Sequence, residues 1–86
     1  MRTYLLTIAS PDGKLFSAEV QRIILRGAEG DLAVMAGHMP FITSVKPCIC
    51  QIMLEDGQEK PAFVDGGLLT VDTNSVTLLT SVFRWE

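Results

Sequence analysis

The sequence contains few of the residues on which catalytic and metal-binding sites depend. Its only histidine is His38, and its only thiols are those of Cys48 and Cys50. A zinc site needs more ligands than two thiols and one imidazole readily supply. On a strand, residues two apart share a face with their Cα atoms roughly 6.5–7 Å apart, the far edge of disulfide geometry. We therefore expect two small buried thiols in a reduced protein and no metal site.

The sequence also lacks an excess of basic residues. Seven lysines and arginines are scattered among ten acidic residues, and the formal net charge is −3. Nucleic-acid binding draws much of its affinity from phosphate neutralisation by a basic surface, so nucleic acid is not an expected partner. No apolar run approaches ~20 residues, and the run at residues 4–9 is too short and interrupted for a signal peptide. If the protein works at a membrane, we expect it to bind there only indirectly, through another protein.

Apolar residues, by contrast, are abundant. Of the 86 residues, 48% are hydrophobic and 20% charged. The length predicts one domain, residues 1–86, and the composition is too apolar for a disordered chain. The apolar content also exceeds the needs of one small core, which suggests that some apolar surface contacts a partner.

Turn-forming residues divide the chain into short runs with period-2 alternation, and no segment of any length shows helical periodicity. The expected strands are 2–9, 14–20, 21–26, 31–35, a short strand between Pro40 and Pro47, 48–55, 59–64, 68–72 and 76–82. Short strands at this regular spacing predict an all-β fold, an about ten-stranded β-sandwich or flattened barrel.

Two details of this prediction concern the hairpin after residue 55. Asp56-Gly57 predicts a type I′ turn, which requires a positive φ at both central positions. Pro61 has no N–H to donate to a ladder, so the returning strand 59–64 is expected at a sheet edge.

Three features could carry chemistry, and each lacks something that the chemistry requires. His38 lies near the hydroxyl residues Thr43 and Ser44 in the sequence, but the context is not that of a nucleophile elbow. Glu29 and Asp31 are close together, but paired-carboxylate mechanisms need a substrate cleft. Residues 27–30 look like a phosphate-binding loop, but a strand and not a helix follows. We therefore expect no enzyme, no catalytic residue and no cofactor.

The middle and the end of the chain carry five specific blocks in order. They are Gly27-Ala28-Glu29-Gly30-Asp31-Leu32-Ala33-Val34, Gly37-His38-Met39-Pro40-Phe41-Ile42-Thr43, Lys46-Pro47, Asp65-Gly66-Gly67-Leu68-Leu69-Thr70-Val71 and Asn74-Ser75-Val76-Thr77-Leu78-Leu79. In this order and spacing they resemble the N-terminal β-sandwich domain of the epsilon subunit of F-type ATP synthases. Ala33, Ala36 and Cys48 stand where that family usually has Gly, Pro and Gly, departures that concern local loop shape.

The resemblance implies a non-catalytic rotor subunit of the central stalk of a proton- or sodium-translocating ATP synthase. The family's domain links the gamma subunit to the c ring and couples ion flow to ATP synthesis through protein contacts. The implied location is peripheral, at the cytoplasmic face of the inner membrane, with no small-molecule ligand. By motif position, the resemblance implies that Glu29, Asp31 and His38 lie on the c-ring side and Thr43 on the gamma side.

Family members typically continue into a two-helix hairpin that inhibits ATP hydrolysis and in some members binds ATP. This sequence stops at Glu86, so we expect the short form, with the stalk role and not the inhibitory one. Two other functions stay open at this point. One is a free-standing β-sandwich adaptor that binds proteins; a secreted adaptor should carry a signal peptide or disulfides. The other is a cupin-like ligand binder, which would need clustered histidines.

Overall fold

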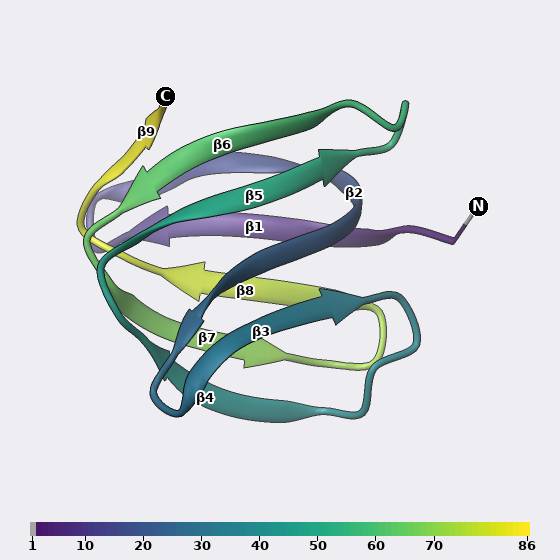
Figure 1. Cartoon of the computed structure of the whole chain (residues 1–86), viewed down its shortest axis with the longest axis horizontal. Helices are drawn as coiled ribbons and strands as arrows, with labels where there is room; N and C mark the ends of the chain where they lie inside the picture. Colours follow the sequence, from purple (N-terminus) through teal and green to yellow (C-terminus); the bar gives the residue numbers. More distant parts are fainter. Residues whose placement is uncertain (1) are drawn as a thin grey trace.

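The computed structural model describes residues 2–86, and these residues form nine β-strands and no helix. The strands are β1 (Tyr4–Ser10), β2 (Gly13–Gly27), β3 (Gly30–Met35), β4 (Phe41–Val45), β5 (Cys48–Leu54), β6 (Glu59–Val64), β7 (Gly67–Val71), β8 (Ser75–Leu79) and β9 (Phe83–Trp85). Figure 1 shows them wrapped around one interior, with β5 and β6 above and β7 and β4 below. The prediction of an all-β fold is confirmed.

The strands form one continuous sheet in the order β1-β8-β7-β4-β2-β5-β6-β9, with β3 attached to β2. Because β1 also pairs with β2, the strands β1, β8, β7, β4 and β2 close into a ring. The pairing of β1 with β8 is parallel, whereas the other strand pairs of the described residues are antiparallel. The architecture is therefore the expected sandwich or flattened barrel, in which closure leaves few free strand edges.

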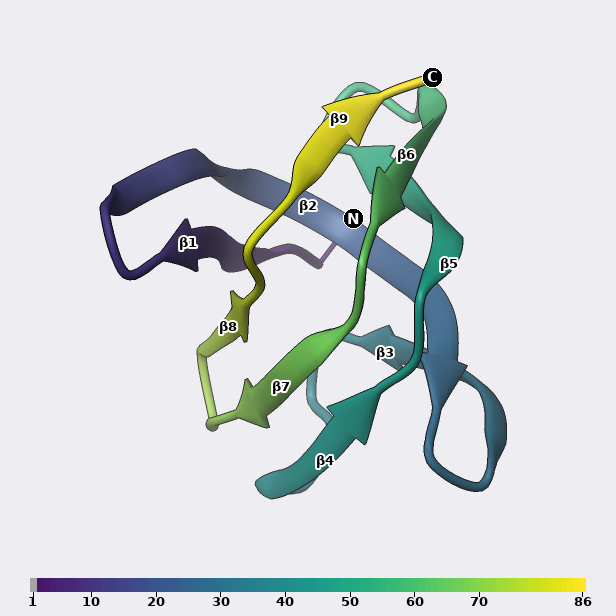
Figure 2. The same cartoon turned by 90° about the vertical axis from the view of Figure 1, so that its left-hand side faces the viewer.

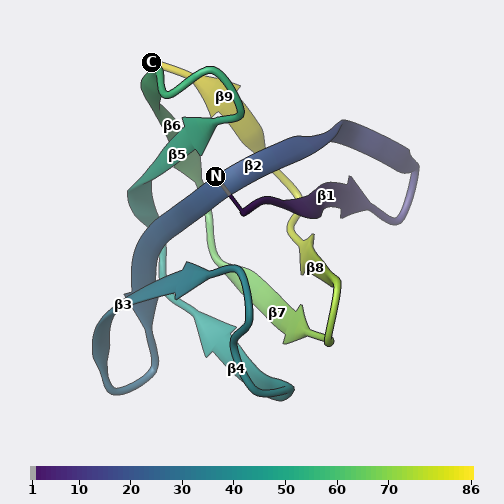
Figure 3. The same ribbon diagram turned by 90° about the vertical axis from the view of Figure 1, so that its right-hand side faces the viewer.

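The long strand β2 replaces two of the nine expected strands, and the unexpected strand β9 keeps the observed number at nine. The sequence predicted two strands, 14–20 and 21–26, but the structure joins them in one strand of 15 residues. Its first half pairs with β1 and its second half with β3 and β5, and the register against β5 shifts between Val20 and Arg22. Such an irregularity bends and twists a strand, so one strand serves both layers. Figure 3 shows β2 crossing the molecule diagonally.

The core is aliphatic and draws alternating residues from eight strands. Its buried members are Tyr4, Leu6, Ile8, Val20, Ile23, Leu25, Val34, Val45, Cys50, Ile52, Ala62, Val64, Leu69, Val71, Val76 and Leu78. The one phenol among them is satisfied, because the hydroxyl of Tyr4 donates to the carbonyl oxygen of Val34 at 2.8 Å. Both cysteines are free; Cys50 is fully buried as expected, whereas Cys48 is only half-buried.

The turn between β5 and β6 differs from the predicted type. Gly57 has a φ of +88°, but no residue other than glycine has a positive φ in the described chain, so the type I′ prediction is wrong. Instead, the N–H of Gly57 donates to the carbonyl of Leu54 at 2.9 Å, in a longer turn with one left-handed residue. The carboxylate of Asp56 accepts from the N–H of Gln58 at 2.9 Å, which favours this local conformation.

The expectation that Pro61 marks an edge strand is also wrong. Strand β6 lies between β5 and β9, as Figure 2 shows. The pairing of β6 with β9 covers only Ala62, Phe63 and Val64, so this ladder requires no hydrogen bond from the proline nitrogen. The sequence did not predict β9, because three residues are too few to show alternation. Trp85 and Phe83 of β9 pack against Phe16, with ring centroids 5.5 and 5.8 Å from it.

Candidate protein-contact surfaces

The acidic residues singled out in the sequence lie at the tight hairpin between β2 and β3. Gly27 pairs with Gly30, so the turn consists of Ala28 and Glu29. Gly30 has a φ of +124°, a backbone conformation that a residue with a Cβ rarely adopts. The hairpin therefore holds Glu29 at its tip and Asp31 at the start of β3. We call residues 28–31 the acidic turn.

The structure brings three of the four predicted contact residues together. Glu29, Asp31 and Thr43 line one open pocket of about 460 Å³, and Leu32, Phe41 and Ile42 add apolar lining. Thr43 comes from β4, and its hydroxyl donates only to the carbonyl oxygen of Ser44 at 3.3 Å. The residues expected on two different sides thus share one surface hollow.

The two carboxylates differ in their electrostatic surroundings. Asp31 accepts a hydrogen bond from Nε of Arg26 at 3.1 Å, and both side chains are exposed, 72% and 59% respectively. An exposed pair of this kind contributes little to stability, about 0–1 kcal/mol. Glu29 has no ion-pair partner among residues 2–86. Sequence reasoning missed Arg26, although a two-residue turn between Gly27 and Gly30 places it directly opposite Asp31.

His38 lies elsewhere. It follows β3, and its N–H donates to the carbonyl of Met35 at 3.3 Å, whereas the acidic turn precedes β3. Its ring meets the ring of Phe41 edge-on, with centroids 5.9 Å apart. The exposed His38 is therefore at the opposite end of β3 from Glu29 and Asp31 (Figure 1).

A second surface is the outer side of β1, β8, β7 and β4, and sequence reasoning singled out none of its residues individually. None of these four strands contains a charged residue. We call their outward residues the uncharged face: Leu5, Thr7, Ala9, Ser75, Thr77, Leu79, Leu68, Thr70, Ile42 and Ser44. Leu5, Leu68 and Leu79 are 40–47% exposed, and Ile42 is 67% exposed. The absence of charge along four paired strands was the signal that could have identified it.

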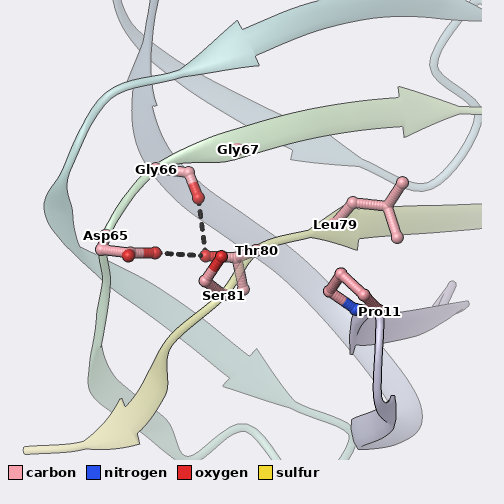
Figure 4. A pocket seen from close by; sticks show the side chains of 7 residues that line it. All are labelled: Pro11, Asp65, Gly66, Gly67, Leu79, Thr80 and Ser81. Carbon is pink, nitrogen blue, oxygen red and sulfur yellow. Dashed lines mark hydrogen bonds between the residues drawn. The ribbon is translucent and has the colours of Figure 1, made fainter.

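One end of the uncharged face deepens into an open pocket of about 510 Å³. Figure 4 shows its lining: Pro11, Asp65, Gly66, Gly67, Leu79, Thr80 and Ser81. The buried hydroxyl of Thr80 donates to the carbonyl of Gly66 at 2.6 Å and lies 3.0 Å from Oδ1 of Asp65. The same carboxylate oxygen accepts from the N–H of Val82 at 3.2 Å. These bonds fix the pocket wall and occupy Asp65 and Thr80 structurally.

The described residues contain neither a candidate metal site nor a membrane-spanning helix. In residues 2–86, no three His, Cys, Asp or Glu side chains are grouped so as to hold a metal ion. Within the same range, no helix has the length and apolarity needed to cross a membrane.

Comparison with known proteins decides the family. Residues 3–86 match the family described as the ATP synthase, Delta/Epsilon chain, beta-sandwich domain. The chain belongs to this family. The resemblance drawn from the five sequence blocks is thereby confirmed, and the Delta/Epsilon β-sandwich domain accounts for the whole described fold.

Two solved structures resemble this Delta/Epsilon domain closely in shape. A chain in the mitochondrial ATP synthase of Euglena gracilis, solved with OSCP, F1 and the c ring, is 26% identical, with a TM-score of 0.88 over 96% of this chain. A chain in the central stalk and c-ring structure of the Tetrahymena thermophila mitochondrial ATP synthase is 14% identical, with a TM-score of 0.75 over 95% of this chain, and shows the fold alone. This chain spans 53% and 66% of the lengths of those two chains.

Proposed function

We propose that this Delta/Epsilon chain is a non-catalytic central-stalk subunit of an F-type ATP synthase. In this role it links the gamma subunit to the c ring and couples ion flow to ATP synthesis. The observation that carries the proposal is the family match over residues 3–86. The likeness to a chain of an assembly that contains F1 and a c ring supports it.

The uncharged face and the acidic turn suit a subunit that transmits force through protein contacts better than they suit a catalytic site. A rotor subunit must transmit torque, so it needs a stiff body and at least two faces that bind protein. Stiffness comes from closed sheet pairing around a close-packed aliphatic core. The uncharged face and the acidic turn offer two chemically different contacts, one apolar and one polar. Interfaces of this kind use apolar area for affinity and charge for orientation.

The acidic turn is the contact proposed for the c ring, and it meets polar loops there through Glu29 and Asp31. Thr43 remains the residue proposed for the gamma side. Since Thr43 lines the same pocket as the acids, gamma and the ring would approach each other at this corner. For His38 to reach the ring as well, the contact must extend along β3 to its far end.

The proposed location follows from these contacts. The chain is peripheral to the membrane, held there by its partners in the synthase. The finer placement, on the cytoplasmic face of an inner membrane, rests on the sequence resemblance, whereas the two structural likenesses are to mitochondrial enzymes.

Removal of the gene from its source cell tests the proposal. Membranes without the chain should still hydrolyse ATP but should build a much smaller ion gradient, because catalysis resides elsewhere and the mechanical link is lost. Adding the purified chain back should restore ATP-driven pumping. Membranes that pump normally without it would favour the free-standing adaptor instead.

A further inference from the structure

A third pocket lies away from both surfaces described so far. It has a volume of about 370 Å³ and is lined by Arg2, Gln21, Arg22, Met35, Ala36 and Met53. We call it the arginine pocket. Arg22 stands in register between Met35 of β3 and Met53 of β5, on the outer side of these strands. The pocket therefore combines two guanidinium groups with two flexible thioether side chains.

Arg22 has an incomplete set of hydrogen bonds. Its Nη2 pairs with Oε1 of Glu59 at 3.2 Å, but its Nε is buried and has no acceptor among residues 2–86. Arg26 and Arg84 differ, because each donates its Nε to a carboxylate, at 3.1 and 3.3 Å. A guanidinium fork is built to bind a carboxylate by two parallel bonds. Within residues 2–86, Arg22 makes only one such bond.

Arg2 contributes a second cation to the same pocket. Its two terminal nitrogens lie 3.0 and 3.1 Å from the point where a Cβ on residue 37 would stand, so Gly37 leaves the space that the guanidinium fills. No carboxylate of residues 2–86 forms an ion pair with Arg2. Of the two guanidinium groups, only that of Arg22 has a carboxylate partner, Glu59. The amide of Gln21 is already engaged, since it donates to the carbonyl of Glu55 at 3.2 Å.

We infer that the arginine pocket binds an acidic side chain of a protein partner, with an adjacent apolar residue resting on Met35 and Met53. Charge complementarity selects the carboxylate, and the methionines favour a protein segment over a free anion. Met adapts its shape to a partner, and Met and Arg are both enriched at protein interfaces. Met35 is 51% exposed, so its side chain is available for such a contact. This inference goes beyond the proposed function and does not depend on the identity of the stalk partners.

Nuclear magnetic resonance of the full chain tests the inference with a small probe. The dipeptide N-acetyl-Asp-Leu-amide should shift the Nε–H resonance of Arg22 and the methyl resonances of Met35 and Met53 saturably, at millimolar concentration. The neutral N-acetyl-Asn-Leu-amide should produce at least tenfold weaker binding, because it lacks the charge. Inorganic phosphate is the third probe. If phosphate binds at the same resonances as tightly as the acidic dipeptide, the pocket is a free-anion site and the proposal is overturned.

Three variants make the result specific. Arg22→Gln should abolish the shifts, while Arg84→Gln, a matched loss of an exposed paired arginine, should leave them unchanged. Glu59→Gln should tighten binding several-fold, because it releases Arg22 from its internal partner. A purely structural Arg22–Glu59 pair predicts no tightening in Glu59→Gln, and that outcome, or the absence of saturable shifts in the natural chain, overturns the inference.

Discussion

The two outer sides of this sandwich enclose the same core but carry opposite chemistry. The uncharged face, on β1, β8, β7 and β4, has no charged residue in any of its four strands. The other side, on the second half of β2 with β3, β5, β6 and β9, carries three ion-paired arginines, at positions 22, 26 and 84. Alternation toward a common aliphatic core fixes the inner residues of both sides equally. Only the outer residues are free to differ.

The difference indicates how one small domain can serve several protein contacts. A side without charges, made of apolar side chains and small hydroxyls, gains affinity from buried apolar area, so it suits a long-lived contact. Charged side chains with incomplete pairing give orientation and salt sensitivity, so they suit contacts that must select a register. Four variants probe this contrast, and they are ordered by the size of the expected effect.

The largest effect is expected where β7 and β8 meet under the uncharged face. A Cβ added to Gly67 would overlap the backbone carbonyl oxygen of Leu79, and the φ of +151° adds backbone strain. Gly67→Ala should therefore lower the free energy of unfolding by at least about 3 kcal/mol. Gly13→Ala is the matched control, because its φ is +134° but nothing lies within 4 Å of the added atom. In urea unfolding, Gly13→Ala should lose much less stability than Gly67→Ala. Equal losses in the two variants would show that the overlap at Gly67 is relieved without cost.

The second effect concerns the core beneath the arginine-bearing side. Burial, reinforced by the neighbouring Cys48, raises the pKa of the Cys50 thiol from 9.0 to about 11. Between pH 9 and pH 11 the folded state therefore keeps a proton that the unfolded state loses. The contribution of the protonated thiol to the free energy of unfolding is complete below pH 9 and is lost as the pH rises to 11. Between pH 7 and pH 10 we expect a loss of about 1.4 kcal/mol.

Comparison with Cys50→Ala isolates that thiol. The variant is less stable at pH 7 because it leaves a cavity, but its stability should fall less steeply up to pH 10. Burial also raises the pKa of Tyr4, from 10.0, so a remaining decline near and above pH 10 belongs to the phenol. Equal slopes in the natural chain and the variant, measured by chemical denaturation, would contradict the assignment to Cys50.

The third effect tests whether the uncharged face binds protein. Leu79→Lys places a charge on that face, beside the open pocket at its end, at a side chain that is 47% exposed. Unfolding stability should stay within about 0.5 kcal/mol, as for other surface changes. Because β4 carries both Thr43 and part of this face, gamma is the partner that we expect here. Affinity for gamma should then fall at least tenfold, because the lysine must be desolvated in an apolar contact. Leu15→Lys, at a 43% exposed leucine outside the face, should bind gamma normally in calorimetry.

The inward-facing residues of the strands were predictable from the sequence, whereas the outward-facing surfaces were only partly predictable. Period-2 alternation located most strands, because burial of every second residue is a local property of the chain. It did not predict that the two halves of β2 form one strand, since a bend within a strand looks like a strand boundary. It missed β9, whose three residues pair with β6 only through distant contacts.

The candidate surfaces show the same limit. The sequence order of the motifs identified Glu29 and Asp31, because both belong to one short hairpin. The position of Thr43 beside them depends on β4 returning past the hairpin, where the N–H of Ala28 donates to the carbonyl of Ser44 at 3.1 Å. The arginine pocket combines Arg2, which precedes β1, with residues of β2, β3 and β5. Only the strand order of the sheet brings these segments together.

The smallest effect on folding is expected at the acidic turn, where the functional effect should nevertheless be large. Replacing Glu29 with Gln and Asp31 with Asn removes one unpaired carboxylate and one exposed partner of Arg26. The free energy of unfolding should change by no more than about ±0.5 kcal/mol, since an exposed pair contributes so little. Association with the c ring should weaken and lose much of its salt dependence, whereas binding to gamma should persist.

The double variant therefore separates folding from coupling. Thermal melts give the first quantity, and ATP-driven proton pumping in reconstituted membranes gives the second. The control replaces two exposed acids elsewhere, Asp12 with Asn and Glu55 with Gln, and so changes the net charge equally. If the control lost pumping to the same extent, the effect would be one of overall charge. If the double variant at the acidic turn pumped normally or unfolded, the turn would not be a coupling contact, and the polar contact would have to lie elsewhere on the arginine-bearing side.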